Sequence, residues 1–169
     1  MGYSVFPAPS AGSKTRKITT LNSGTSYTVP AGVNYINVTT IGGGGAGAGG
    51  SSTDARSGYT FSNGHGGQIV MSTVNTTPGA TINYTIGAGG NTTGSSGNGP
   101  SGGNAGGTTT FTGADSATGG QGVGANFANY TGKNSVNGWV SPNGGSSGNG
   151  SNSGGGAGGA GQIIIEYWE

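Results

Sequence analysis

Short stretches in which apolar and polar residues alternate are separated, along this chain, by long runs of glycine. The alternation is clearest over 81–87, where Ile82, Tyr84 and Ile86 share one face and polar residues the other, which predicts a half-buried strand. Similar patterns predict further strands at 17–21, 25–30, 33–41, 68–75, 108–113 and 162–169. The chain is therefore expected to be built mainly from strands.

Two details of this pattern predict how strands are connected. Thr77-Pro78-Gly79-Ala80 separates two strand patterns with Pro and Gly at turn positions, which predicts a hairpin between 68–75 and 81–87. In the last strand, 162–169, isoleucines occupy both faces. Because this strand ends so close to the terminus, we expect the C-terminus to be tied into the sheet.

The glycine runs cover 42–50, 87–107, 119–124 and 144–161. Gly45, Gly47 and Gly50 match G-x-G-x-x-G, but a dinucleotide site needs a helix after that motif, and no helical periodicity follows. A flexible linker would leave unexplained why strands with good alternation flank each run.

The interpretation we favour is polyglycine II, a left-handed extended helix with three residues per turn and no internal hydrogen bonds. Its backbone groups must be paired by neighbouring segments, and only glycine or very small residues permit that approach. Glycines at a spacing of three occur, for example Gly155, Gly158 and Gly161. Irregular, tightly packed glycine loops remain the alternative.

Composition limits the fold further. Gly accounts for 43 of 169 residues, and Leu21 is the single leucine, so a large apolar core is excluded and backbone hydrogen bonds must contribute an unusual share of stability. Helix-forming residues are scarce. We expect an all-β fold without helices: a small antiparallel β-sandwich or sheet combined with glycine-rich, polyglycine II-like segments, and oligomeric.

The same composition excludes several functions. The net charge is +1 and only 5% of residues are charged, which argues against nucleic-acid binding. There is no Cys and one His, so neither a metal site nor a cofactor is expected, and no arrangement of catalytic residues suggests an enzyme. No run approaches the ~18 apolar residues of a membrane span, and no export signal follows Met1, so synthesis in the cytoplasm is expected.

The N-terminal residues differ from the remainder. Pro7 and Pro9 favour an extended arm, so we expect an attachment arm over 1–17 and a glycine-rich β domain over 18–169. A solvated terminus without a partner is the alternative. The candidate attachment residues are Tyr3, Val5, Phe6, Lys14, Arg16 and Lys17.

Three segments together resemble a known family: "GTSYTVPAGVNYINVTTIGGGGAGAGG", "TTPGATINYTIGAGGN" and the closing "GGAGQIIIEYWE". They are similar, in this order, to the glycine-rich domain of tailed-bacteriophage tail fibres and related virion proteins, from about Gly24 to Glu169. A looser likeness is to the tail-fibre-tip adhesins of T-even-type phages, with their polyglycine II sandwich. The resemblance implies a virion protein with β-structure, often trimeric or attached to a fibre. The chain lacks the coiled coil and shaft repeats of a full fibre.

Recognition is expected in the segments that interrupt the glycine pattern, 51–65 and 125–142. Tyr, Trp and Arg among Ser, Gly and Asn are typical of adaptable binding loops, and flat aromatic rings suit sugar faces or apolar protein edges. The alternative is that these aromatic residues cap a small core. The candidates for receptor binding are Asp54, Arg56, Tyr59, Phe61, His65, Phe127, Tyr130, Lys133 and Trp139.

The function expected from these observations is that of a phage tail-fibre or tail-tip adhesin in the virion. Its expected partners are other virion proteins of the tail fibre, baseplate or capsid, further copies of itself with a trimer favoured, and a bacterial surface glycan or outer-membrane protein. The alternative is a structural decoration or fibre protein of the head or tail without a dedicated receptor. An ice-binding polyglycine protein is disfavoured by the irregular glycine spacing and the aromatic insertions.

Overall fold

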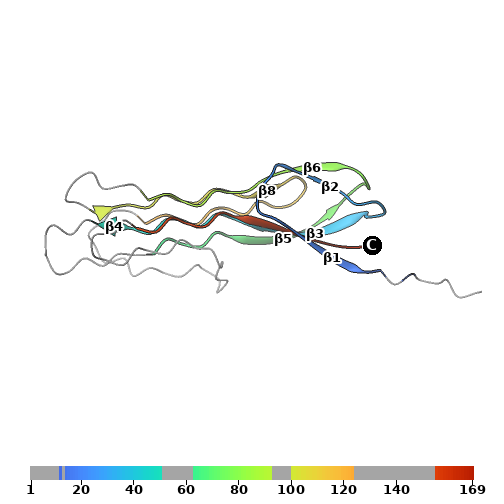
Figure 1. The fold of residues 1–169 in the computed structure, drawn as a ribbon, viewed down its shortest axis with the longest axis horizontal. Helices are drawn as coiled ribbons and strands as arrows, with labels where there is room; N and C mark the ends of the chain where they lie inside the picture. The colour runs from blue at the N-terminus through green and yellow to red at the C-terminus, as the bar shows by residue number, and fades with distance from the viewer. Residues whose placement is uncertain (1–11, 13, 51–62, 93–99, 124–154) are drawn as a thin grey trace, which may run out of the picture.

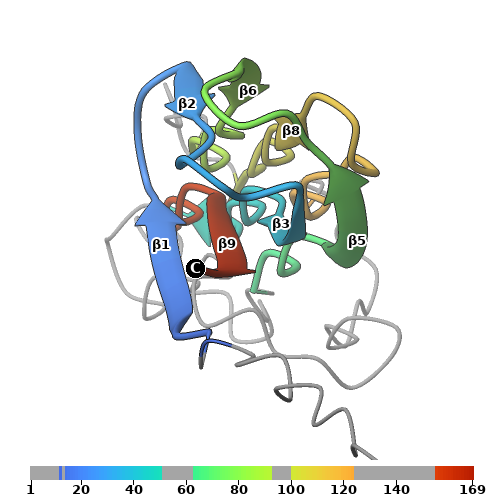
Figure 2. The same cartoon turned by 90° about the vertical axis from the view of Figure 1, so that its right-hand side faces the viewer.

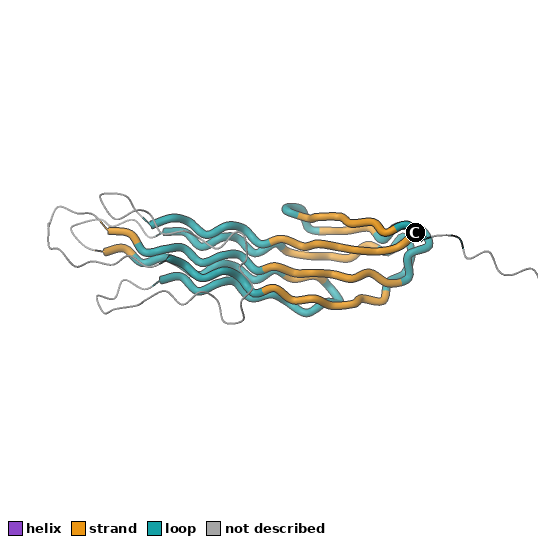
Figure 3. The backbone as a smooth tube through the Cα atoms, turned by 90° about the horizontal axis from the view of Figure 1, so that it is seen from below, coloured by secondary structure: helices purple, strands orange, loops and turns teal. Residues whose placement is uncertain are grey.

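A computed structural model describes residues 12, 14–50, 63–92, 100–123 and 155–169 (Figure 1). Within these residues the fold is all-β, with nine strands and no helix. Seven of the nine strands gather at one end of an elongated molecule, and glycine-rich segments run side by side toward the other end (Figure 3). The expected fold class is confirmed.

The larger sheet has four antiparallel strands in the order β1-β9-β3-β5. They are β1 (Arg16–Leu21), β3 (Tyr35–Ile41), β5 (Ile69–Asn75) and β9 (Gln162–Trp168). The C-terminal strand therefore lies inside the sheet, between β1 and β3, which confirms that the C-terminus is tied into the sheet. Arg16 and Lys17 begin β1, so the sheet starts two residues before the expected boundary at 18.

The second sheet has three antiparallel strands in the order β2-β6-β8, and it covers one face of the first (Figure 2). Its strands are β2 (Ser26–Thr28), β6 (Thr81–Thr85) and β8 (Thr110–Phe111). A further short pair, β4 (Gly49–Gly50) with β7 (Pro100–Ser101), lies at the far end of the glycine segments.

The apolar core lies between the two sheets and is small. Ile36, Ile163 and Ile165 are fully buried on the larger sheet, and they face Tyr84 and Phe111 of the smaller one. The rings of Tyr84 and Phe111 stack with their centroids 6.4 Å apart. Alternation in 81–87 thus marks the buried face correctly.

The predicted hairpin between 68–75 and 81–87 is wrong. β5 pairs with β3, whereas β6 pairs with β2 and β8 in the other sheet. The turn crosses between sheets because Val29 holds it: the Val29 amide donates to Ala80 O (2.9 Å), and the Gly79 amide donates to Val29 O (2.9 Å). Gly79 has a φ of 79°, which allows this tight turn.

Beyond the sandwich, the described residues contain six extended glycine segments, which we number in chain order. The sequence patterns had indicated four runs. The run 87–107 is divided between two antiparallel segments, and 63–68 is an additional one. The first to sixth glycine segments are 42–48, 63–68, 87–92, 102–108, 117–123 and 155–161.

The first glycine segment is buried along its whole length and bonds to its neighbours in rotation. Successive amides from Gly42 to Gly47 donate to the second, fourth and sixth segments in turn, then repeat that order, with N···O distances of 2.8–3.0 Å. Donor direction therefore returns every three residues, as in polyglycine II. The favoured interpretation of the glycine runs is confirmed for these residues.

The other five segments surround the first. Their backbone hydrogen bonds link them in the order second, fifth, fourth, third, sixth. Directions alternate: the first, third and fifth segments run away from the sandwich, and the second, fourth and sixth return to it. Each outer segment bonds to a neighbour at every third residue, for example Gly158 to Gly90 and Gly161 to Gly87.

Each outer segment carries one recurring motif, X-Gly-Gly-X, in which X is not glycine. The five motifs are His65-Gly-Gly-Gln68, Ala88-Gly-Gly-Asn91, Ala105-Gly-Gly-Thr108, Thr118-Gly-Gly-Gln121 and Ala157-Gly-Gly-Ala160. The X residues are exposed, apart from the half-buried His65. With three residues per turn, every third side chain points to solvent and the two glycines between contact other segments.

The glycines inside the bundle leave no room for a side chain. A Cβ on Gly158 would lie 1.9 Å from the carbonyl oxygen of Gly44, and one on Gly45 would lie 2.1 Å from that of Gln121. Both obstacles are backbone atoms that are themselves held in the hydrogen-bond network. Main-chain packing here takes the place of an apolar core.

Candidate functional site

The six glycine segments have their outer ends together, at the end of the bundle away from the sandwich. The chain leaves this end at Gly50, Thr92 and Val123. It re-enters at Asn63, Pro100 and Gly155. We call this the loop end of the bundle, and the same connectivity follows from the alternating segment directions.

The loop end is held by backbone contacts. Gly50 pairs with Pro100, and Thr92 forms a bridge with Gly103. The Gly103 amide in turn donates to Val123 O at 2.8 Å. Backbone contacts thus hold Gly50, Thr92 and Val123, from which the three connecting sequences start, to the stretch 100–103.

Most of the candidate receptor-binding residues belong to sequence that connects these points. Asp54, Arg56, Tyr59 and Phe61 follow Gly50, but they lie outside the described residues. Phe127, Tyr130, Lys133 and Trp139 follow Val123 and also lie outside them. Their side chains stay predictions from sequence.

His65 is the described member of that set, and it belongs to the second glycine segment. Its amide donates to Gln121 O (3.0 Å), and its carbonyl accepts from the Gly45 amide (2.8 Å). The side chain is half-buried on the outside of the bundle. The backbone of His65 therefore helps to hold the second segment against the first and the fifth.

Sequence reasoning missed a row of polar side chains beside His65. Gln68, Thr118 and Gln121 are exposed on the adjacent second and fifth segments. Gln68 Oε1 accepts from both the amide and the hydroxyl of Thr118, at 3.2 and 3.1 Å. The X-Gly-Gly-X motif was the signal that could have identified this surface.

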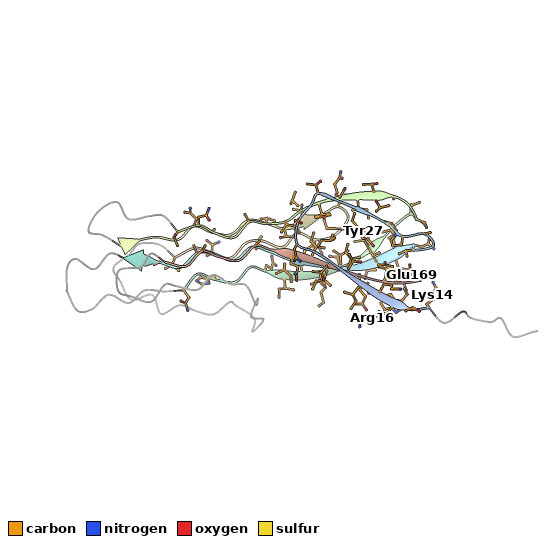
Figure 4. The ribbon with its side chains drawn as sticks, viewed as in Figure 1. Lys14, Arg16, Tyr27 and Glu169 are labelled. Atoms are coloured by element: carbon orange, nitrogen blue, oxygen red, sulfur yellow. The ribbon has the colours of Figure 1, made fainter. Side chains whose placement is uncertain are left out.

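The described attachment candidates, Lys14, Arg16 and Lys17, lie at the opposite end, next to the C-terminus (Figure 4). Arg16 Nε donates to Glu166 Oε1, and Lys17 Nζ lies 3.4 Å from Glu169 Oε1. Hydrogen bonding to Arg16 lowers the pKa of Glu166, and the same bond raises that of Arg16. Lys14 is exposed, whereas Tyr3, Val5 and Phe6 lie outside the described residues.

Tyr27 is the one side chain of the described structure with a buried polar atom that lacks a hydrogen-bond partner. Burial, with smaller contributions from the charges of Tyr167 and Glu169, raises its pKa to about 12. Its ring lies 6.3 Å from that of Phe111, centroid to centroid. Tyr27 belongs to β2 and Phe111 to β8, so this ring contact lies within the smaller sheet.

Other kinds of site find no support in the part of the chain that the structure describes. No group of three or more His, Cys, Asp or Glu side chains could hold a metal ion there. None of the described segments is a helix with the length and apolar character needed to cross a membrane.

Comparison with known proteins assigns the chain to a family. The sequence model of the glycine-rich domain matches residues 19–163, which is most of the chain, so this protein belongs to the glycine-rich domain family. The match covers all six glycine segments and the strands from β2 to β8, and it includes only parts of β1 and β9. A search of curated proteins finds no match.

Proposed function

We propose that this chain is a bacteriophage virion protein, a tail-fibre or tail-tip adhesin that binds the host cell surface at its loop end. The observation that supports this most is the topology of the bundle: three separate connections start and finish at one end. The sandwich and C-terminus lie at the other. This polarity suits a protein attached to a particle at one end and presenting variable segments at the other.

Two further observations favour the proposal. The resemblance of the sequence, from about Gly24 to Glu169, to the glycine-rich domain of tail fibres supports a virion protein. The connecting sequences 51–62 and 124–154 contain the aromatic and charged residues typical of binding loops, in a chain where both types are scarce. The ligand class is a surface glycan or the exposed edge of an outer-membrane protein.

The mode of action is non-covalent binding. Each copy would contribute a modest contact through aromatic rings and amide side chains. Several copies on one appendage would convert these into firm adsorption, because the second and later contacts form at high effective concentration.

Host adsorption by particles that carry variant protein tests the proposal. Two variants each remove one aromatic pair: Tyr59→Ser with Phe61→Ser, and Tyr130→Ser with Trp139→Ser. The expected result is that at least one variant lowers the adsorption rate by about tenfold or more. Particle yield and protein content should stay unchanged.

A matched control replaces exposed residues of the bundle, Gln121→Ser with Ala157→Ser. It should adsorb as the parent does. Adsorption that stays normal in both aromatic variants, with intact particles, would reject the adhesin and leave a structural decoration protein of the head or tail. Loss of particles in the aromatic variants would also count against it.

A further inference from the structure

The larger sheet has an open edge at β1. Thr15 and Glu169 exchange both backbone hydrogen bonds, at 2.7 and 3.1 Å, so they form a hydrogen-bonded pair of the β1–β9 ladder. Such pairs alternate along an antiparallel ladder. The N–H and C=O groups of Arg16, Ile18 and Thr20 therefore point away from β9, and no other described strand pairs with β1.

The edge strand itself carries an exposed apolar side chain, Ile18. The exposed large hydrophobic residues of the described structure are Ile18, Tyr35 and Met71, with 56%, 47% and 73% of their surface accessible. Strand register places all three on the outer face of the larger sheet, opposite the core. An open edge that carries an exposed apolar side chain, as β1 does at Ile18, is a site for pairing with another strand.

The opposite edge of the same sheet is different. The 115–118 stretch lies against β5 and against Gln68, the residue before it. The Asp115 amide donates to Ser72 Oγ at 3.0 Å, and Thr118 donates to the Gln68 side chain. Pairing of β1 with β5 of another copy, head to tail, would meet this stretch. The strand that remains available to the β1 edge is therefore β1 of a second copy.

We propose that two copies of this chain associate by antiparallel pairing of β1 with β1 about a two-fold axis at Ile18. In this register the two Ile18 side chains face each other across the axis. Arg16 lies opposite Thr20 of the second copy, and Lys17 lies opposite Thr19. No like charges oppose one another, which favours the pairing.

The pairing has two consequences. The two four-stranded sheets become one continuous sheet, and the two exposed Ile18 side chains cover each other in part. Because a two-fold contact uses the same surface on both copies, it closes at the dimer and does not propagate into a fibre. This inference does not depend on the proposed adhesin function.

Single-cysteine variants of the full chain test the inference, since the natural sequence has no Cys. Ile18→Cys places two thiols across the axis, at a spacing a disulfide can bridge. Met71→Cys is the matched control: it is exposed on the same outer face but lies on the far edge strand, three strands from β1. Mild oxidation should give disulfide-linked dimer from Ile18→Cys about tenfold faster than from Met71→Cys.

Sedimentation of the unmodified chain gives the second measurement, and a dimer is expected. Ile18→Lys brings two positive charges together at the axis and should weaken dimerisation by about tenfold or more. Met71→Lys should leave it unchanged. A monomer or a trimer in solution would overturn the inference, as would equal cross-linking of the two cysteine variants; the cross-linking test still decides if Ile18→Lys does not fold.

Discussion

The hydroxyl of Thr109 donates a hydrogen bond to the carbonyl oxygen of Ile41 at 2.7 Å, at the point where β3 becomes the first glycine segment. The hydroxyl oxygen of Thr109, Oγ1, also accepts a hydrogen bond from the Gly87 amide, at 3.0 Å. Thr109 is fully buried. One side chain therefore joins three stretches of chain at the boundary between sandwich and glycine bundle, where strand pairing gives way to polyglycine II pairing.

Removing the Thr109 hydroxyl should weaken the connection between the sandwich and the glycine bundle. Thr109→Val keeps the shape of the side chain but leaves the Ile41 carbonyl and the Gly87 amide without their partner in a buried place. We expect a loss of about 3 kcal/mol in the free energy of unfolding, measured by denaturant titration. Thr112→Val is the control: Thr112 is exposed, and its hydroxyl donates to Asn83 O at 2.9 Å, so its loss should be under about 1 kcal/mol.

The glycine bundle should reject a single methyl group at one position and accept a larger group next to it. Gly158→Ala directs a Cβ at the Gly44 carbonyl, 1.9 Å away, and should cost about 3 kcal/mol or prevent folding. Ala157→Val enlarges an exposed neighbour and should change the melting temperature little. Equal effects of the two changes would contradict the packing described for the sixth glycine segment.

Amide hydrogen exchange should follow the three-residue period. Every amide from Gly42 to Gly47 is bonded, so all should exchange slowly. In the sixth segment, Gly158 and Gly161 donate to Gly90 and Gly87, so their amides should exchange more slowly than that of exposed Ala157. Residue-resolved exchange by NMR makes the comparison, and rates close to random coil throughout these segments would contradict it.

The sandwich should lose stability at high pH because of Tyr27. Its pKa is about 12 in the folded chain, against an ordinary value of 10.0. The unfolded chain therefore loses this proton first, so the stability that the neutral phenol provides is complete below pH 10 and falls as the pH rises toward 12.

Tyr27→Phe removes the titrating group and a hydroxyl that lacks a partner within the described structure. It should leave stability at pH 7 unchanged or raise it by about 1 kcal/mol. Its unfolding free energy should also fall less than that of the parent between pH 10 and pH 12. Identical alkaline titrations of parent and variant would show that Tyr27 is not responsible.

Much of this fold can be predicted from local patterns. Alternation such as Ile82, Tyr84, Ile86 marks strands and their buried faces, because a strand's side chains alternate whatever it pairs with. Which strand pairs with which was harder to predict. The turn at 77–80 has the residues of a hairpin, yet Val29, far away in sequence, binds it and directs β6 into the other sheet.

The glycine segments show a similar limit. Glycine density locates the runs, but it does not show that 87–107 folds back on itself or that His65-Gly-Gly-Gln68 belongs with them. The X-Gly-Gly-X spacing carries that information, because one residue in three faces solvent in every outer segment. The sequence proposes the candidate binding loops as interruptions of the pattern, and apart from His65 their candidate residues lie outside the described part of the chain.

The three-residue rotation of hydrogen bonds also governs how such a chain can change length over evolution. Insertion of a single residue would turn every later side chain by a third of a revolution and drive the exposed ones into neighbouring backbones. An insertion of three restores the phase, provided that the antiparallel neighbour gains three as well. Relatives with longer or shorter bundles should therefore differ from this chain by three residues, or a multiple of three, in each of two antiparallel segments.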